Sequence, residues 1–579
     1  MKYPKLNQQQ TTRDVIDVFK GYNHNLRIGT GEFYDMQNLT SADFPVLSPR
    51  SKRGIYAEPD NAQGLISKDS LCWVDGADFV IGEDRIHLNL SIDDTPKNLI
   101  SMGAYVIIMP DKKYVNTADL DDYGNIEASV TTDTMVTFTL CKNDGTDYGH
   151  VPSLDYEPPN PENMALWIDT STTPHVLKQY SATTGTWITI ATTYIKIAAT
   201  GIGKPFSADD GVTISGVEDS TLADLNSTMI VWDRADDYII VTGIINKVIR
   251  QVAPITVTRR MPNMDYMTES ENRLWGCRYG TDIHGNIVNE IYASKLGDFK
   301  NWNSFMGIST DSYAATVGTD GKFTGAITHL GYPLFFKENC VHKVYGNFPS
   351  NYQIQTTACR GVQNGCSKSL AIVNEILYYK SRYAVCSYDG SLPVEMSSAL
   401  GDISYSDAIA GALGNKYYIN MKDTSGIYHL FVYDTSKGMW HKEDNIRVKD
   451  FCSSSGDLFF VDYADKKIKS INGNGTAEPG AVKWIAETGL IGTDSPDKKY
   501  ISRIDIRMSL EIGSMVDVYV QYDSMGAWEH LFVMMGTNLR SFSVPIRPRR
   551  CDHLKLKIEG KGEAKIFSIC KTIEQGSDI

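Results

Sequence analysis

The sequence predicts an all-β protein, and three observations support this fold class. The chain holds 32 tyrosines and recurrent threonine-rich runs, and aromatic and β-branched side chains pack well on the pleated surface of a strand. A unit of two short apolar strands joined by a polar turn occurs repeatedly along the chain. The last part of the chain alternates apolar and polar side chains with a period of two, as strands with one buried face do.

The repeated unit predicts a β-propeller of about 6–8 blades, because the later units recur at about the 40–50-residue length of a four-stranded blade. One hairpin cannot bury its hydrophobic face alone, whereas stacked hairpins can. The units begin with LCWVDGADFVIG at Leu71, AYVIIMPDKKYVN at Ala104, RLWGCRYG at Arg273, PLFFKENCVHKVYG at Pro333, ILYYKSRYAVCSYDG at Ile376, KYYINMKDTSGIYHLFVYD at Lys416 and LFFVDYADKKIKSIN at Leu458.

The stretch between the second and third units is too long for a loop and carries its own strand signals. We therefore expect an inserted β domain over residues 120–245. Its predicted features are a pair of hairpins from Ala165 with turns at Thr173-Pro174 and Thr184-Gly185, and strands in DDGVTISG from Asp209 and DDYIIVTGII from Asp236.

Residues 488–579 are predicted to form a C-terminal antiparallel β-sandwich. In IDIRMSLEI, one face of a strand would carry Ile504, Ile506, Met508, Leu510 and Ile512. The remaining divisions are an N-terminal segment with the first blades over 1–119 and further blades over 246–487. The helices expected are short, DVIDVF from Asp14 and ADLNS from Ala223.

Composition narrows the possible functions. The net charge is −14 and no block of five or more Lys or Arg occurs, whereas a protein that grips nucleic acid normally has a basic face. An acidic wall would instead let a DNA duplex pass without sticking. The ten cysteines form no CxxC pair, which argues against zinc ribbons and thiol redox chemistry and favours small buried side chains in a reducing cytoplasm. Neither an apolar signal-peptide region nor a membrane-spanning apolar stretch is expected.

The sequence predicts no catalytic residue, no cofactor site and no metal site. The GxGxxG, GxxxxGK[ST], HExxH and GxSxG signatures do not occur. The nearest approach to a sialidase Asp-box, SATTGTW from Ser181, lacks the Asp. We interpret Trp187, Trp440 and Trp528 as hairpin aromatics that pack on their own strands. A glycosidase needs two carboxylates about 5–10 Å apart, and the sequence singles out no such pair, so a propeller hydrolase stays the least favoured alternative.

Two charged patterns allow more than one interpretation. The acidic runs DLDDYGNIE from Asp119 and NDGTDYG from Asn143 offer oxygen ligands, but neither fits the spacing of a calcium-binding loop, so we interpret them as solvated loop tips. The basic run IRPRRCDHLKLKIEGKGEAK is either a solvated sandwich face or a contact with an acidic neighbouring subunit. Its cations are Arg547, Arg549, Arg550, Lys555, Lys557, Lys561 and Lys565.

Three segments resemble structural proteins of bacteriophage tails. Residues 21–54 resemble the opening of phage tail nozzle or hub proteins of the podovirus nozzle or stabilisation type, and 271–302 looks like a blade that these proteins share. Residues 377–400 are similar to a further blade of such proteins in phages of Gram-positive gut bacteria. The matching positions in the first segment are Asn25, Glu32, Asp35, Asn38, Leu47, Arg50 and Arg53.

The resemblance implies a β-propeller that assembles as a ring of about six copies at the lower end of a tail. The implied location is the virion, after assembly in the host cytoplasm. Genomic DNA would pass through the lumen without sequence-specific contact, and the neighbours would be adaptor, fibre or tail-tip subunits. Arg50 and Arg273 would anchor blades through main-chain carbonyls, and Asp298 and Asp389 would cap turns. The structural motif residues implied are Asn25, Asn38, Arg50, Arg273, Trp275, Asp298, Trp302 and Asp389.

The alternative function is a receptor- or glycan-binding tail protein that acts through the inserted domain. Trp167, Tyr180, Trp187 and Tyr194 lie close together in the sequence, and aromatic rings of this kind could stack on a sugar. The competing interpretation is that these aromatics form the core of the inserted domain, since two of them occupy strand positions of one hairpin.

Overall fold

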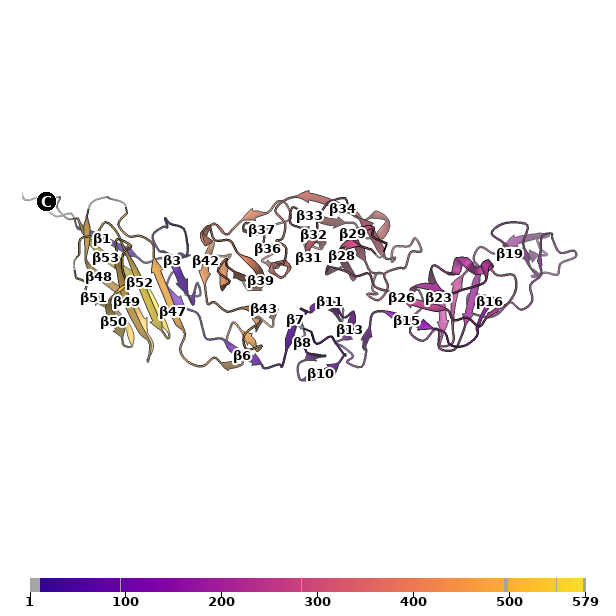
Figure 1. The fold of residues 1–579 in the computed structure, drawn as a ribbon, viewed down its shortest axis with the longest axis horizontal. Coiled ribbons are helices and arrows are strands. Elements are labelled where there is room, and N and C mark those ends of the chain that lie inside the picture. The colour runs from indigo at the N-terminus through magenta and orange to yellow at the C-terminus, as the bar shows by residue number, and fades with distance from the viewer. Residues whose placement is uncertain (1–10, 94, 283, 494–497, 548, 576–579) are drawn as a thin grey trace, which may run out of the picture. The chain divides into compact units, whose positions relative to one another are not determined.

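The computed structural model of the protein describes residues 11–93, 95–282, 284–493, 498–547 and 549–575 (Figure 1). These residues form 53 strands and four short 3-10 helices, so the all-β prediction is confirmed. The chain divides into two compact units. The first unit comprises residues 1–99, 334–342 and 356–579, and the second comprises 100–333 and 343–355.

All seven predicted hairpins are present, and each supplies two neighbouring strands of its sheet. In the second unit, β12 (Tyr105–Met109) and β13 (Lys113–Asn116) lie in the sheet β11-β12-β13-β14, and β28 (Arg273–Thr281) and β29 (Ile287–Ala293) lie in the sheet β27-β28-β29-β30. These two sheets share one hydrophobic core, in which Ile107 and Tyr114 pack with Leu274 and Trp302.

In the first unit, the hairpins from Leu71, Ile376, Lys416 and Leu458 form equivalent pairs. They are β8 (Ser70–Asp75) with β9 (Asp78–Ile81), β36 (Ile376–Lys380) with β37 (Val385–Tyr388), β40 (Lys416–Lys422) with β41 (Tyr428–Asp434), and β44 (Asp457–Asp462) with β45 (Ile468–Ser470). The hairpin from Pro333 supplies β32 (Tyr332–Lys337) and β33 (Cys340–Tyr345), whose sheet is divided between the two units.

The same type of turn precedes several of these hairpins. Two-residue loops lie at 271–272, 374–375, 414–415 and 455–456. Each joins the first strand of a sheet to the second strand, with which the hairpin begins. The first residue of every loop has a left-handed φ, between 49° and 55°. Such turns match the right-handed twist of paired strands, and the residues found here, such as Asn374 and Gly414, tolerate that conformation.

The inserted domain contains an eight-stranded sheet ordered β15-β26-β22-β23-β24-β21-β16-β25. Besides β15 and β26, its strands are β16 (Val136–Cys141), β21 (Tyr194–Ala198), β22 (Gly211–Ser215), β23 (Thr228–Ala235), β24 (Tyr238–Thr242) and β25 (Ile249–Gln251). A separate four-stranded sheet contains β17 (Ser153–Leu154), β18 (Leu166–Asp169), β19 (Val176–Ser181) and β20 (Thr186–Thr189). The larger sheet runs from β15 (Ala128–Thr131) to β26 (Thr256–Arg259), whereas the sequence predicted 120–245. The difference arises because β14 (Tyr123–Asn125) pairs with the preceding hairpin, and β26 closes the domain by pairing with β15. The short helix near Ala223 is a 3-10 helix, Ser220–Leu225.

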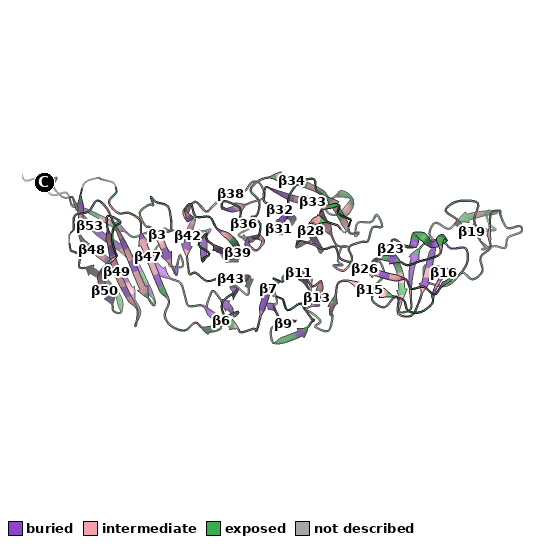
Figure 2. Ribbon diagram, in the orientation of Figure 1, coloured by how far each residue is buried: buried purple, intermediate pink, exposed green. Residues whose placement is uncertain are grey.

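The C-terminal residues form two antiparallel sheets, and Figure 2 shows buried residues alternating with less buried ones along several of their strands. One sheet is β1-β53-β48-β51, and the other continues a larger sheet as β3-β47-β52-β49-β50. The strands from the end of the chain are β48 (Lys499–Leu510), β49 (Met515–Tyr522), β50 (Glu529–Met535), β51 (Asn538–Val544), β52 (Leu554–Lys561) and β53 (Ala564–Gln575). The sequence placed this domain at 488–579, but β47 (Lys483–Thr488), β3 (Glu32–Gln37) and β1 (Thr11–Ile16) also belong to it.

Two local predictions about these sheets are wrong. DVIDVF was expected to be helical, but β1 (Thr11–Ile16) pairs along its whole length with β53 (Ala564–Gln575), and this tertiary pairing overrides the local helical signal. Ile504, Ile506, Met508 and Leu510 are buried on one face of β48 (Lys499–Leu510), as expected. Ile512 is 91% exposed, because the strand ends two residues before it.

Candidate functional site

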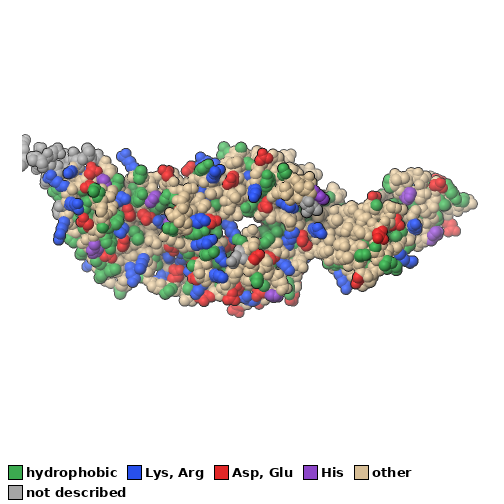
Figure 3. All heavy atoms as spheres, in the orientation of Figure 1, with side chains coloured by type: hydrophobic (Ala, Val, Ile, Leu, Met, Phe, Trp, Pro, Cys, Tyr) green, Lys and Arg blue, Asp and Glu red, His purple; other side chains and the backbone are tan. Residues whose placement is uncertain are grey.

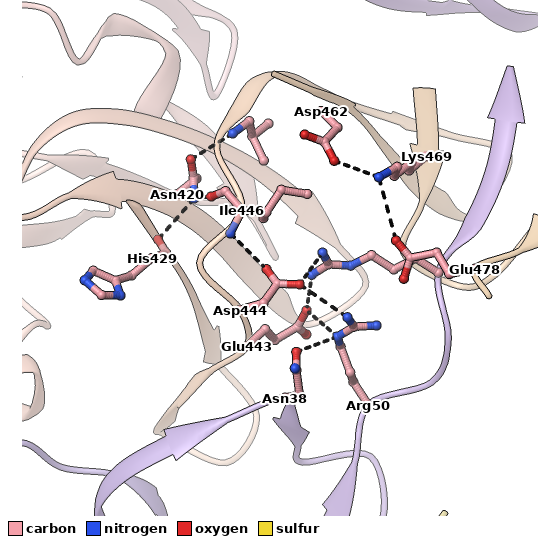
Figure 4. Close-up of polar contacts among 12 residues, drawn as sticks. Asn38, Arg50, Asn420, His429, Glu443, Asp444, Ile446, Asp462, Lys469 and Glu478 are labelled. Carbon is pink, nitrogen blue, oxygen red and sulfur yellow. Dashed lines mark hydrogen bonds and ion pairs between the residues drawn. The ribbon is translucent and has the colours of Figure 1, made fainter. Parts of the chain in front are cut away.

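The motif residues of the N-terminal segment converge on a buried ion-pair cluster, defined by Arg50, Arg53, Glu443 and Asp444 (Figure 4). The Arg53 side chain is only 1% exposed. Its Nη1 donates to Oδ2 of Asp444 over 2.6 Å, and its Nη2 donates to Oε2 of Glu443 over 2.8 Å. Arg50 donates from Nη2 to the same Asp444 oxygen over 3.2 Å. Two carboxylates therefore balance two guanidinium groups inside the protein.

The surroundings of the cluster shift the pKa values of its two arginines in opposite directions. Burial alone would lower the pKa of Arg53, but the charges of Asp444 and Glu443 outweigh burial and leave that pKa above its ordinary value. Burial and the neighbouring Arg53 lower the pKa of Arg50. The Arg53 guanidinium also lies 5.1 Å from the ring centroid of Phe460. Removing one partner from such a buried cluster costs about 3–5 kcal/mol, because it leaves a charge without its counter-ion.

The cluster joins the N-terminal segment to three other parts of the first unit. Asn38, which has a φ of 55°, accepts from Nε of Arg50 over 2.8 Å and donates from Nδ2 to the Lys483 carbonyl over 2.9 Å. The main chain of Asn38 donates to the Glu443 carbonyl, and Glu478 donates to the Arg53 carbonyl. Beyond Glu478, Lys469 lies 2.7 Å from Asp462 (Figure 4).

The ion-pair cluster fixes the path of the strand that follows Arg53. β6 (Gly54–Ala57) follows Arg53 directly and pairs antiparallel with β45, which comes from the other end of the chain. Gly54 is required by the close approach of backbone, since a Cβ at this position would overlap the carbonyl oxygen of Asn474. The N-terminal motif thus adds a strand to the last of the repeated sheets.

The other motif residues of the N-terminal segment contact both a neighbouring residue and distant parts of the chain. Asn25 donates from Nδ2 to Oδ1 of Asn23 over 2.7 Å and to the Ser398 carbonyl over 2.9 Å. Asp35 pairs with Lys442 at 2.7 Å. The Arg50 side chain donates to the Ser51 carbonyl and otherwise bonds the side chains of Asn38 and Asp444, so it differs from the carbonyl anchor that the sequence suggested.

The second group of motif residues builds the loop 294–312, which connects β29 to β30 (Tyr313–Thr316). The buried Arg273 guanidinium donates from Nη1 to the Ser294 carbonyl over 2.8 Å and to the Asp311 carbonyl over 2.5 Å. Its Nη2 donates to the Ser309 carbonyl over 2.8 Å. Arg273 therefore holds both ends of the loop through main-chain carbonyls, which is the type of contact expected for it.

The interior of the loop 294–312 is held by its own side chains. Trp302 is buried and donates to the Phe299 carbonyl over 2.9 Å. Asp298 accepts from the Lys300 amide over 2.9 Å, and burial raises its pKa. Oδ2 of Asp311 accepts from the amides of Met306, Gly307 and Ile308. The sequence did not identify Asp311, because only the folded loop brings its carboxylate to these amides.

Asn301 connects the same loop to the inserted domain. It donates from Nδ2 to the Asp209 carbonyl over 2.6 Å and accepts from the Gly211 amide over 3.1 Å. Lys295 pairs with Asp209 at 3.2 Å. Two motif residues lie elsewhere: Trp275 packs against Tyr352 with ring centroids 5.0 Å apart, and Asp389 accepts from the Ser391 amide at a separate turn.

Three of the four aromatic residues proposed to contact glycan, Trp167, Tyr180 and Trp187, lie together in the small sheet β17-β18-β19-β20. The ring centroid of Trp187 lies 5.3 Å from that of Trp167 and 5.4 Å from that of Tyr180. Trp167 is 2% exposed and donates to the Leu154 carbonyl, so its ring faces are covered. Tyr194 is buried as well and packs against Trp232 in the larger sheet. These contacts favour the core interpretation for Trp167 and Tyr194.

The charged patterns singled out in the sequence make intramolecular contacts. Asp122 accepts from the hydroxyls of Tyr105 and Tyr114. In the basic run, Lys555 pairs with Glu487 and Lys565 pairs with Asp43. Across the described ranges, no group of three or more His, Cys, Asp or Glu side chains is arranged to hold a metal ion.

The cysteines lie mostly inside the protein. Eight of the ten cysteines are buried and two are half-buried, in line with the interpretation as small core side chains. The part of the chain that the structure describes contains no helix long and apolar enough to cross a membrane.

Comparisons with known proteins give the chain no family. No protein-family model matches it, and no curated protein matches it. Among solved structures, a similarity to U3-55K covers 73% of this chain and 99% of that one at 7% identity and a TM-score of 0.28. A similarity to an exo-beta-1,3-galactanase from Phanerochaete chrysosporium covers 53% of this chain and 94% of that one, at 9% identity and a TM-score of 0.20. Similarities this low carry no argument about function.

Proposed function

We propose that this chain is a structural subunit of a bacteriophage tail, a nozzle or hub component that acts by assembling with copies of itself around the channel through which DNA leaves. The observation that carries the proposal is what the buried arginines in the matching segments bind. Arg53 and Arg273 are both buried and bind carboxylates or main-chain carbonyls. They fix connecting segments between sheets, which is what a rigid assembling subunit needs.

The proposed architecture treats the repeated sheets as blades of a β-propeller of about 6–8 blades. In chain order the candidate blades are β7–β10, β11–β14, β27–β30, β31–β34, β35–β38, β39–β42 and β43–β45 with β6. The remaining edge strands are β7 (Ala62–Lys68), β10 (Asp84–His87), β11 (Asn98–Met102), β27 (Tyr266–Ser270), β31 (Phe323–His329), β34 (Gln353–Ala358), β35 (Ala371–Val373), β38 (Val394–Glu395), β39 (Ser406–Leu413), β42 (Met439–Lys442) and β43 (Val448–Ser454). Two observations within the first unit support stacking of this kind. The sheets β39–β42 and β43–β45 share a core that includes Leu430 and Phe460. The sheets β43–β45 and β7–β10 share a core that includes Phe459 and Trp73.

The pairing of β6 with β45 supports closure of the propeller. It joins a strand from the start of the chain to the last sheet, and it covers a strand edge that would otherwise be open to pairing with other chains. In this proposal the insertion and the sandwich are available for contacts with other copies and with adaptor, fibre or tail-tip subunits. The net charge of −14 would keep DNA from adhering to the channel wall.

The test is the assembly of the purified full-length chain. Mass photometry and negative-stain images should show closed rings of about six copies, and cryo-EM of the phage particles should place the chain in the tail. A chain that stays monomeric at every concentration and is missing from purified particles would overturn the proposal. Release of sugar from a polysaccharide that stops when one pair of carboxylates is mutated would overturn it in favour of a hydrolase.

A further inference from the structure

The second unit contains a cleft of about 640 Å³ with a strongly basic lining. It lies where the inserted domain meets the repeated sheets. Strands β15 and β26 of the insertion contribute one side, and residues from β28 and the loop 294–312 contribute the other. The charged and polar residues that line it include Lys112, Glu127, Arg259, Arg260, Arg278 and Asn303.

Two of the four cations in the cleft are neutralised within the chain, and two are not. Lys112 pairs with Glu127 at 2.8 Å, and the buried Arg259 pairs with Asp210 at 2.5 Å. Arg260 is exposed and Arg278 is half-buried, and neither forms an ion pair with any residue that the structure describes. Arg278 makes one contact of 3.4 Å with the Thr281 carbonyl. Two guanidinium groups in the cleft are thus available to an acidic partner.

An apolar surface continues from the cleft along the loop 294–312. Two residues after Asn303, the loop exposes Phe305, whose side chain is 56% accessible, followed by the exposed Met306 and Ile308. The Asp311 carboxylate holds the amides of Met306 and Ile308 in place. These side chains are therefore presented by an ordered loop, and little conformational entropy would be lost when a partner covers them.

We propose that this cleft binds an acidic turn of a second copy of the chain, with Arg260 and Arg278 pairing with Glu83 and Asp84. The inference rests on the proposed function, since it names the contact between neighbouring copies. Glu83 lies in the turn between β9 and β10 (Asp84–His87), and Asp84 begins β10. Both are exposed, and neither forms an ion pair with another residue in the described ranges.

Charge and apolar character both support this choice of partner surface. The chain is acidic overall, and Figure 3 shows Asp and Glu side chains gathered over the strands β8 to β10. Ile92 follows that sheet and is strongly exposed beside Asp93. An acidic surface with an exposed apolar side chain matches a basic cleft bordered by Phe305 and Met306. Because the two surfaces differ, each copy can use both, and a closed ring results if the rotation closes.

The test exchanges the charges of the two surfaces in the full-length chain. Arg260→Glu/Arg278→Glu and Glu83→Lys/Asp84→Lys should each weaken self-association at least ~10-fold in mass photometry. An equimolar mixture of the two variants should restore assembly, because each mismatched surface then faces its complement. Lys322→Glu, a charge reversal of the same sign at an exposed position outside the cleft, should assemble as the unmodified chain does.

The outcomes separate this inference from the proposed function. Rings that form equally well in both charge variants would overturn the inference while leaving a ring-forming subunit intact. An unmodified chain that never assembles would overturn both. If Arg260→Glu/Arg278→Glu leaves assembly unchanged but abolishes binding of a labelled DNA duplex, the cleft is a phosphate site and the inference is wrong.

Discussion

Acidification is expected to destabilise the region around His441, a histidine in β42 (Met439–Lys442). Its side chain is 2% exposed, and neither ring nitrogen has a hydrogen-bond partner among the described residues. Burial and, to a smaller extent, the nearby Lys416 lower the pKa of His441 to about 3, against the opposing effect of Asp434. The folded protein therefore holds this imidazole neutral at pH values where the unfolded chain would protonate it.

The size of the effect follows from the two pKa values. The unfolded value is 6.5 and the folded value about 3, so the unfolded state binds more protons at any pH between them. Stability is then lost as the pH falls below 6.5. At about 1.4 kcal/mol per pH unit, the loss amounts to about 2 kcal/mol at pH 5 and about 3 kcal/mol at pH 4.

Hydrogen exchange of the amides in β41 and β42 measures this local stability. The comparison is between the unmodified chain and His441→Leu, which removes the imidazole and keeps a side chain of similar volume. As the pH falls from 6.5 to 4, the free energy of local opening should become increasingly larger in the variant than in the unmodified chain. At pH 7 the variant should be at least as stable, since two buried unpaired nitrogen atoms are removed.

His150→Leu is the matched control, because His150 is exposed and its replacement should leave the pH dependence at β42 unchanged. If the unmodified chain and His441→Leu lose protection in parallel between pH 6.5 and pH 4, the imidazole is solvated or paired in solution. The assignment of a buried neutral histidine would then be refuted.

Three further predictions concern the motif segments. Arg53→Met should lower the free energy of local opening of β6 by about 3–5 kcal/mol. Adding Glu443→Leu should recover part of this loss. A loss below about 1 kcal/mol for the single change would contradict a buried ion pair. Gly54→Val should displace β6 from β45, because the added side chain would overlap the Asn474 carbonyl. Hydrogen exchange of the β45 amides should then become faster, and unchanged exchange would refute this prediction. Asp311→Ala should leave the amides at the tip of the loop 294–312 without their acceptor, which should destabilise the loop by about 1–3 kcal/mol. Trypsin should then cleave the loop faster. Equal cleavage rates in the variant and the unmodified chain would show that Arg273 alone orders the loop.

The candidate site could be predicted from the sequence only in part. Arg50, Arg53 and Arg273 were singled out from the matching segments, but their partners were not. Glu443 and Asp444 lie roughly 390 residues away from Arg53 along the chain. No local pattern connects positions this far apart, because the contact depends on where two strands from opposite ends of the chain meet. The carboxylate of Asp311 was missed for the same reason on a smaller scale, since its role depends on the closed shape of its loop.

The sequence by itself determined the local elements of this protein. The hairpins from Leu71 to Leu458 and the alternation from Ile504 to Leu510 follow from side-chain periodicity, which neighbouring residues impose on a strand. Only the tertiary structure decided how the ends of these elements pair. It placed β6 beside β45, β1 beside β53 and β26 beside β15. Hydrogen bonding between backbones carries no side-chain code for a distant partner, so such pairings are settled by which hydrophobic faces can be buried together when the whole chain folds.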